Sequence, residues 1–315
     1  MKAFAITGFG GNEVMKEIDI AIPEPAENEV QVRIRYAGIN PIDWKIREGY
    51  LKALFQHKFP MILGKDASGV ITKIGSNVKK FKVGDTIYSN TRKADVTSGS
   101  YAEYITLDEN IVAHAPGNIP LAQAASVPLV SLTAWQALFD NIHLSSGKTI
   151  LIHGGAGGVG SLAVQLAKLQ GAIVYTTAHI TQHDFVKSIG ADYALNYEEE
   201  NYEFKIDRKI DAVFDCAGGN SLKKSVQIVK SGGIVVTIVG GVTPEIQQEA
   251  HVKEIALKLM FTMPNGEQLG KIKSLIEENK LSLPPIKEFT FNQITQALND
   301  VQKGTVKGKC VISID

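Results

Sequence analysis

The first third of the chain alternates between apolar and polar positions and is divided by glycines into short runs. Residues 30–36 (VQVRIRY) place an apolar side chain at every second position, which is typical of a half-buried β-strand. Short apolar runs follow between the glycines of residues 64–89, and residues 101–106 predict one more strand. Several short strands with glycine turns predict a compact, mostly antiparallel β domain.

After Pro120 the pattern changes to helices and then to strands that alternate with helices. Residues 121–139 are rich in alanine and other apolar residues, which favours helices. The apolar run 150–152 precedes a segment, 159–169, in which apolar residues recur with the helical period. Similar elements follow it: predicted strands at 173–177, 212–214 and 234–239, and predicted helices at 185–189 and 222–229. This alternation predicts βαβ units around a buried parallel sheet.

The final segment predicts a helix at 269–278, a break at Pro284-Pro285 and a last strand at 309–314. We expect this tail to return to the β domain, so that an αβ domain is inserted between two parts of it. The predicted fold class is α/β, with a β domain over 1–120, an inserted αβ domain over 121–264 and the returning segment over 265–315.

Composition narrows the function classes. The 315 residues are 44% hydrophobic, and 33 Lys and Arg balance 33 Asp and Glu, which argues against nucleic acid as the main partner. Two cysteines, Cys216 and Cys310, exclude a disulfide framework and a four-thiolate zinc site. No run approaches the roughly 18 apolar residues of a membrane span, and the N-terminus lacks the apolar stretch of a signal peptide. We therefore expect a cytoplasmic protein.

The most informative segment is a glycine cluster, residues 153–160 (HGGAGGVG), between the predicted strand 150–152 and a predicted helix. Its glycines have the G-x-G-x-x-G spacing of dinucleotide-binding turns, which allows a tight turn, close approach to a pyrophosphate and close helix packing. The N–H groups at the start of such a helix bind phosphates. The residues expected to hold a dinucleotide here are Gly155, Ala156, Gly157, Gly158, Val159 and Gly160.

The end of the predicted strand 173–177 indicates which dinucleotide binds. NAD-binding folds usually place Asp or Glu there, on the ribose 2′-OH. This chain has no carboxylate at that position, and no arginine either. Thr177, His179 and Thr181 can instead form hydrogen bonds with a 2′-phosphate. The sequence therefore predicts NADPH as the cofactor.

With this motif in place, the chain resembles the medium-chain dehydrogenase/reductase superfamily, and within it the zinc-independent quinone oxidoreductases of the zeta-crystallin type. The resemblance extends over nearly the whole chain and is strongest from Gly147 to Lys168 (GKTILIHGGAGGVGSLAVQLAK). Further matching segments are Gly64-x-Asp66-x-x-Gly69, Val83-Gly84-Asp85 and Leu132-Thr133-Ala134. The resemblance implies a GroES-like β domain and a Rossmann domain.

The resemblance also implies roles for residues outside the glycine cluster. Thr133 is expected beside the nicotinamide, Tyr197 near the adenosine phosphate, and Gly240 and Gly241 on the nicotinamide side. The family usually dimerises through the edge of the Rossmann sheet, and the apolar strand 234–239 permits this. We therefore expect a homodimer.

Two departures from the zinc enzymes of the superfamily indicate that no metal is used. Those enzymes place a Cys ligand where this chain has Asn40, and a His-Glu pair where it has Lys65-Asp66. A catalytic zinc ion needs about three converging protein ligands, and Lys65 would bring a positive charge instead. An acceptor reduced without zinc must itself be electrophilic, as a quinone or an α,β-unsaturated carbonyl is.

The segment 40–47 (NPIDWKIR) carries the candidate catalytic residues. Many quinone reductases have Tyr in place of Lys45, and this form resembles plant alkenal/enone reductases and chloroplast envelope quinone-reductase homologues. Lys45 and Asn40 are candidates to stabilise negative charge on the substrate oxygen, with Asp43 orienting Lys45 or relaying a proton. Ordinary roles are equally open: a turn at Asn40, a helix cap at Asp43 and a solvated lysine.

Aromatic residues in and after this segment have two interpretations. Trp44, Tyr50 and Phe55 can line a site for a flat substrate or pack in the core.

The sequence leaves three functions open. The first is an NADPH-dependent reductase of quinones or α,β-unsaturated carbonyls. The second is an enoyl-thioester reductase, for which Lys79-Lys80 would bind the phosphate-containing carrier. The third is a non-catalytic protein that binds or senses NADPH.

Overall fold

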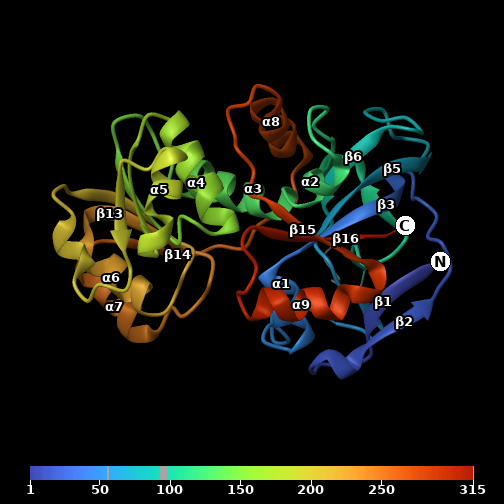
Figure 1. Ribbon diagram of the computed structural model, residues 1–315, viewed down its shortest axis with the longest axis horizontal. Helices are drawn as coiled ribbons and strands as arrows, with labels where there is room; N and C mark the ends of the chain where they lie inside the picture. Colours follow the sequence, from blue (N-terminus) through green and yellow to red (C-terminus); the bar gives the residue numbers. More distant parts are fainter. Residues whose placement is uncertain (55–56, 93–97, 315) are drawn as a thin grey trace. The chain divides into compact units, whose positions relative to one another are not determined.

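The computed structural model describes residues 1–54, 57–92 and 98–314. The chain forms two compact units, one from Met1–Leu132 with Met263–Asp315 and one from Thr133–Thr262. Figure 1 shows both chain ends, blue and red, in the first of these units. No helix formed by the described residues is both long and apolar enough to cross a membrane.

The first unit is built mainly from antiparallel strands, as predicted. Within the described ranges, one sheet has the order β15-β16-β3-β5-β6-β8 with β7 on β3, and a smaller sheet has the order β2-β1-β4. The strands are β1 (Lys2–Ile6), β2 (Met15–Asp19), β3 (Glu29–Ile39), β4 (Met61–Ile62), β5 (Asp66–Ile74), β6 (Thr86–Asn90), β7 (Tyr104–Asp108), β8 (Val112–His114), β15 (Ile286–Thr290) and β16 (Lys309–Ser313).

Strand β3 is central to the larger sheet. It pairs antiparallel with β5, β7 and β16, so the C-terminal segment adds a strand to this sheet. Val32 and Ile34 are buried, and so is Gln31, which was expected to face solvent. The Gln31 amide donates to the carbonyl of Pro23 (2.8 Å), which satisfies this buried polar group.

Helices α2 (Leu121–Ala125) and α3 (Pro128–Trp135) begin in the first unit. The Ser68 hydroxyl donates to the carbonyl of Leu121 (2.7 Å), and the N–H of Leu129 donates to Asp66 (2.7 Å). These bonds attach the helices to strand β5, and the first unit extends to Leu132. The other helices of this unit are α1 (Pro41–Arg47), α8 (Gly266–Glu277) and α9 (Ile294–Gln302).

The second unit is a parallel sheet with the strand order β11-β10-β9-β12-β13-β14. This is the 3-2-1-4-5-6 order of the Rossmann fold. Its strands are β9 (Thr149–His153), β10 (Ile173–Ala178), β11 (Tyr193–Asn196), β12 (Ile210–Asp215), β13 (Val229–Thr237) and β14 (Ala256–Leu259). Its helices are α4 (Gly158–Leu169), α5 (His183–Ser188), α6 (Asn220–Ile228) and α7 (Pro244–Val252).

One prediction about this sheet is wrong. The apolar strand expected at 234–239 as the dimerisation edge is β13, which pairs with β12 on one side and β14 on the other. Val235 and Val236 are fully buried, as expected for an interior strand that is covered on both faces. The free edge at this end of the sheet belongs to β14, where Leu259 is 44% exposed.

The docking of α2 on the β domain can be tested at Gly38. A Cβ there would lie 2.3 Å from the carbonyl oxygen of Ala125. We expect Gly38→Ala to lower the free energy of unfolding by about 2 kcal/mol through overpacking, as measured by urea denaturation.

Gly270→Ala is the matched control. Its Cβ would meet no atom within 4 Å, and alanine stabilises a helix by about 1 kcal/mol relative to glycine. This variant should therefore be slightly more stable than the wild type. If Gly38→Ala had the same free energy of unfolding as the wild type, α2 would not pack against β3 as the structure describes.

Candidate active site

Most predicted cofactor residues lie at one edge of the parallel sheet. Because β9 to β14 are all parallel, their carboxyl ends meet at the same edge. The glycine turn follows β9, His179 and Thr181 follow β10, Tyr197 follows β11, and Gly240 follows β13. Ligands of doubly wound sheets bind at this edge, where the strand order reverses, which here is between β9 and β12.

The turn between β9 and α4 has no room for side chains at two of its glycines. A Cβ at Gly155 would lie 1.9 Å from the hydroxyl of Thr176, and one at Gly160 would lie 2.2 Å from the carbonyl oxygen of Gly154. Gly157 is the N-cap of α4, and no side chain caps the helix. The first N–H groups of α4 therefore lack a side-chain acceptor, and the turn fits the pyrophosphate of a dinucleotide.

Thr177 is buried beneath this turn. Its hydroxyl accepts the N–H of Gly154 (3.1 Å), its carbonyl accepts the N–H of Gly155 (3.0 Å), and the hydroxyl lies 3.2 Å from Nδ1 of His153. The structure therefore gives Thr177 a contact with the turn itself, which differs from the predicted contact with a 2′-phosphate.

His179, Thr181 and Tyr197 lie together. Nδ1 of His179 lies 2.8 Å from the hydroxyl of Thr181, and its ring centroid lies 6.3 Å from that of Tyr197. Tyr197 is 54% exposed, so its ring is available to a ligand. Sequence reasoning missed the carboxylate of Glu198, which lies 3.3 Å from Nε2 of His179 and follows β11 rather than β10.

The residues predicted on the nicotinamide side have distinct geometries. The hydroxyl of Thr133 is buried and shares a hydrogen bond with Thr262 (2.6 Å), which follows β14. Gly240 and Gly241 have φ of +90° and +82°, a conformation that favours glycine. A Cβ at either position would meet no atom of the described residues within 4 Å, so the backbone there is accessible.

In the first unit, Asn40 belongs to a buried polar network. Its amide donates to Asp66 (2.8 Å) and accepts from the ammonium of Lys309, which also donates to the carbonyl of Ile39 (3.0 Å). Burial raises the pKa of Asp66 to about 7, while the positive charge of Lys309 opposes this shift. Burial lowers the pKa of Lys309, and the carboxylates of Asp66 and Asp43 oppose that shift.

Asp43 closes the first turn of α1. Its carboxylate accepts the backbone N–H of Asn40 (2.8 Å) and the hydroxyl of Tyr101 (2.9 Å). Burial raises the pKa of Asp43. The helix-capping role considered for Asp43 is therefore present in the structure.

Lys45 lies apart from these two residues. Its side chain is half-buried, and its ammonium lies 5.7 Å from the centroid of the Trp44 ring. In the part of the chain that the structure describes, no hydrogen bond or ion pair joins Lys45 to Asp43, as expected for positions i and i+2 of a helix. Trp44 and Tyr50 pack edge to face with centroids 5.8 Å apart. Phe55 lies outside the described residues.

The residues at the position of the superfamily's catalytic zinc do not fit a zinc ion. Asn40 and Lys65 replace two ligands, and the ammonium of Lys309 lies against Asn40. Among residues 1–54, 57–92 and 98–314, no three His, Cys, Asp or Glu side chains are grouped to hold a metal ion.

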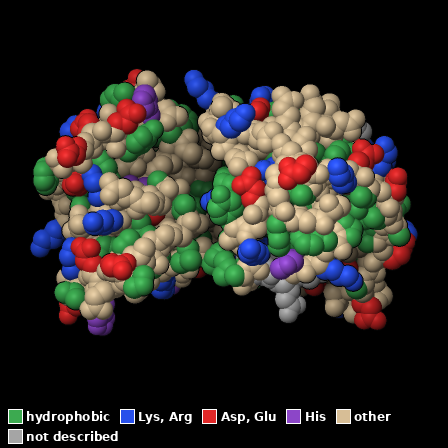
Figure 2. All heavy atoms as spheres, turned by 90° about the horizontal axis from the view of Figure 1, so that it is seen from below, with side chains coloured by type: hydrophobic (Ala, Val, Ile, Leu, Met, Phe, Trp, Pro, Cys, Tyr) green, Lys and Arg blue, Asp and Glu red, His purple; other side chains and the backbone are tan. Residues whose placement is uncertain are grey.

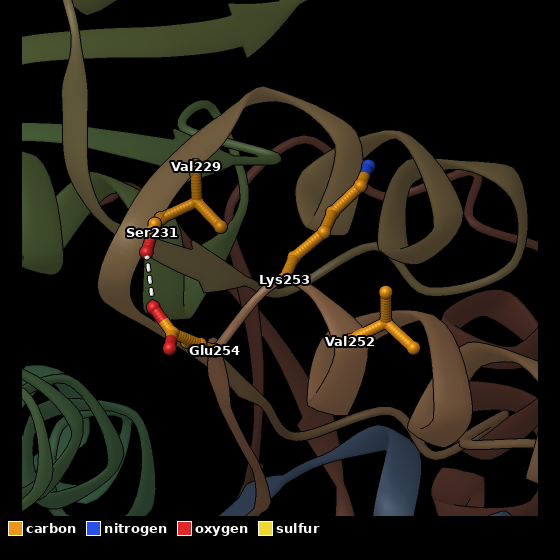
Figure 3. A pocket seen from close by; sticks show the side chains of 5 residues that line it. All are labelled: Val229, Ser231, Val252, Lys253 and Glu254. Atoms are coloured by element: carbon orange, nitrogen blue, oxygen red, sulfur yellow. Dashed lines mark hydrogen bonds between the residues drawn. The ribbon is translucent and has the colours of Figure 1, made fainter.

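A shallow pocket in the second unit lies away from these residues. Figure 3 shows its lining, which comes from the start of β13 (Val229, Ser231) and the end of α7 (Val252, Lys253, Glu254). The Ser231 hydroxyl donates to Glu254 (2.8 Å), as the dashed line shows. Because β13 begins here, the pocket is at the opposite edge of the sheet from the glycine turn.

Figure 2 shows Lys, Arg, Asp and Glu side chains mixed over one face of the molecule.

Sequence reasoning missed three residues that these networks depend on: His153, Thr262 and Lys309. A histidine that ends an apolar strand was the available signal for His153. Their partners are distant in sequence, so no local pattern could reveal the bonds.

Segments from both units match known protein families. Residues 26–117 match the family described as "Alcohol dehydrogenase GroES-like domain", and residues 189–312 match "Zinc-binding dehydrogenase". The "NADPH-dependent alkenal/one oxidoreductase, chloroplastic" of Arabidopsis thaliana is 38% identical over 99% of this chain and 79% of that protein. The "2-methylene-furan-3-one reductase" of Solanum lycopersicum is 37% identical over the same shares.

The fold is also that of a solved quinone oxidoreductase. The enzyme from Coxiella burnetii superposes with a TM-score of 0.90 at 33% identity, covering 100% of this chain and 99% of that one. Identity above 30% along the whole chain, together with the same two domains, confirms the family expected from the sequence. The chain belongs to the medium-chain dehydrogenase/reductase family, among its quinone and alkenal/one oxidoreductases.

Proposed function

We propose that this protein is an NADPH-dependent reductase that transfers hydride, without a metal ion, to quinones or α,β-unsaturated carbonyls. The observation that carries the proposal is the glycine turn between β9 and α4, which offers uncapped N–H groups at the carboxyl edge of the sheet. Relatives named for NADPH-dependent alkenal/one reduction and for quinone reduction support the cofactor and the acceptor class.

The second unit binds and orients the cofactor. NADPH, when bound, supplies the hydride. The N–H groups of Gly158, Val159 and Gly160 hold its pyrophosphate, with Gly155, Ala156 and Gly157 shaping the turn. His179 and Thr181 hold the 2′-phosphate beside Tyr197, and Thr133, Gly240 and Gly241 lie on the nicotinamide side. Thr177 contributes by holding the turn in place.

In the first unit, Lys45 donates to the substrate oxygen as negative charge develops there. Its ammonium forms no ion pair within the described residues, and it lies 5.7 Å from the centroid of the Trp44 ring, which itself packs against Tyr50. Asn40 and Asp43 act mainly by fixing the start of α1, since the Asn40 amide is held between Asp66 and Lys309. Such prearranged donors stabilise charge without reorganisation during the reaction.

The Lys79-Lys80 pair that motivated the enoyl-thioester alternative is exposed on the β domain. The backbone N–H groups of both residues donate to Glu109 (3.1 Å), and the Lys80 ammonium donates to Asn110 (2.7 Å). The Lys80 side chain is therefore engaged within its own β domain.

We also propose that the protein forms a homodimer through β14. We further propose that it works in a reducing compartment such as the cytoplasm. Leu259 at the end of β14 is 44% exposed, and Phe261, two residues later, is 43% exposed, so this free strand edge presents apolar side chains to a partner. The thiols of Cys216 and Cys310 are both free, as in a reducing compartment.

The dimer is tested by sedimentation equilibrium, which should give twice the 34.1 kDa mass of the chain. A mass of 34.1 kDa, that of a monomer, would contradict the dimer.

The reaction class is tested by following NADPH oxidation with a naphthoquinone, an alkenal and crotonyl-CoA. We expect turnover of the quinone or the alkenal, unchanged after chelation of divalent metals. Turnover of crotonyl-CoA alone would favour the thioester reductase. No turnover of any acceptor, with NADPH binding measured separately, would favour the non-catalytic protein.

Lys45→Ala tests the oxyanion donor. We expect kcat/KM to fall at least about tenfold, since a donor to developing charge is lost, while the Kd for NADPH changes less. Lys52→Ala is the matched control, because Lys52 is exposed five residues after the end of α1. Wild-type kcat/KM in Lys45→Ala would reject the assignment.

His179→Ala tests the contact with the 2′-phosphate. Loss of the imidazole should raise the Kd for NADPH by about threefold to tenfold, because a hydrogen bond to a charged phosphate is lost, and should leave the Kd for NADH unchanged. His251→Ala, at an exposed position in α7, serves as the control. An equal effect on both dinucleotides would place His179 elsewhere.

A further inference from the structure

His153 is a buried titratable residue that the proposed reaction does not use. It is the last residue of β9, directly before the glycine turn, and its side chain is fully buried. Nδ1 lies 3.2 Å from the hydroxyl of Thr177 on β10, and Nε2 lies 3.1 Å from the hydroxyl of Ser225 on α6. The imidazole therefore connects two elements on either side of the strand.

The proton positions in this network follow from counting donors. The Ser225 hydroxyl donates its only hydrogen to the carbonyl of Ser221 (2.7 Å), so its oxygen must accept from His153. Nε2 therefore carries the proton. A neutral imidazole has one N–H, so Nδ1 accepts the hydrogen of the Thr177 hydroxyl.

The network continues in both directions. At one end, the oxygen of the Thr177 hydroxyl accepts the N–H of Gly154, which starts the glycine turn (3.1 Å). At the other end, the Ser221 hydroxyl lies 2.8 Å from both Asp215 and the carbonyl oxygen of Gly218, and Asp215 also accepts the N–H of Gly218 (2.9 Å). These hydrogen bonds, together with the backbone of Ser221, join the turns that follow β9 and β12, the two strands at the reversal of strand order.

We propose that His153, as the neutral Nε2–H tautomer, is a positioning residue that holds the turns after β9 and β12 in the arrangement that binds the dinucleotide. The inference rests on the proposed function for the identity of the ligand. A protonated imidazole would offer two N–H donors, and Nδ1 would lose the hydrogen bond from Thr177. The protonated Nδ1 would instead donate to the Thr177 oxygen, which can still accept the N–H of Gly154, and the Thr177 hydrogen would lose its acceptor.

The surroundings favour the neutral form. The groups that face the ring are Asp215 on β12, Lys224 on α6 and the ring of Tyr202, whose centroid lies 6.3 Å away. Burial lowers the pKa of His153 to about 4, and Lys224 adds to this, while Asp215 opposes it. The unfolded chain protonates the same imidazole near its ordinary pKa of 6.5, so this group destabilises the fold as the pH falls from about 6.5 to about 4.

The tautomer is tested by ¹⁵N NMR of labelled histidines in the ligand-free wild-type protein. The His153 signal is assigned by its loss in His153→Phe. If that variant does not fold, through-bond experiments on the wild type give the assignment. We expect the shift pattern of a neutral Nε2–H imidazole that persists from neutral pH to about pH 5. An Nδ1–H pattern, or a cationic His153 at neutral pH, would overturn the proposal.

The positioning role is tested by Thr177→Val and Ser225→Ala, which remove one hydroxyl each from opposite ends of the imidazole. Both should raise the Kd for NADPH and for NADH by about tenfold, since the shared turns are affected. Thr177→Ser should recover most of the affinity because it restores the hydroxyl. Ser188→Ala is the control, because that exposed hydroxyl bonds only within α5.

The outcomes separate this inference from the proposed function. Unchanged Kd values in folded Thr177→Val and Ser225→Ala would overturn the positioning role, and so would an effect of Thr177→Val on NADPH alone. Failure of the wild type to bind either dinucleotide would reject the proposed function, while the NMR result would still decide the tautomer.

Discussion

The close approach of helix α4 to strands β9 and β10 is the constraint on which the dinucleotide site depends. Gly155 and Gly160 leave no space for a Cβ atom, so the backbone turns sharply and the helix begins against the strand edge. A side chain at either position would move α4 and redirect its first N–H groups. The phosphate site proposed at this turn is therefore a consequence of backbone packing, and the side chains around it mainly preserve that packing.

In the first unit the constraint is electrostatic, because the polar network of Asn40, Asp66 and Lys309 is buried. Removing charges from water is unfavourable unless they are paired and hydrogen-bonded. Here Asn40 bridges Asp66 and Lys309, and the Leu129 N–H satisfies a second oxygen of Asp66. A lysine thus supplies the positive charge beside Asp66. The same bonds attach the cap of α1 and the start of α3 to the β domain.

The sequence predicted the features that depend on local spacing. The glycine turn, the helix after it and the alternation of the second unit are all encoded within short windows. The exceptions involve distant partners: His153 and Ser225 are separated by 72 positions, and Lys309 and Asn40 by 269. Hydrophobicity identified β13 as buried but could not distinguish an interior strand from a dimer edge, because both are apolar. That distinction required the pairing of β14.

A reductase that receives its hydride from a bound dinucleotide needs few reactive side chains of its own. What the protein must supply is geometry, since correct placement of donor and acceptor can account for several kcal/mol of the barrier. Residues that fix turns and caps then affect catalysis as directly as residues that touch the substrate. Asp43 illustrates this: its carboxylate caps α1 through Asn40 and accepts from Tyr101, and α1 carries Lys45. The structural and functional interpretations of such residues are therefore compatible, and a substitution must be judged by separate measurements of binding, turnover and stability.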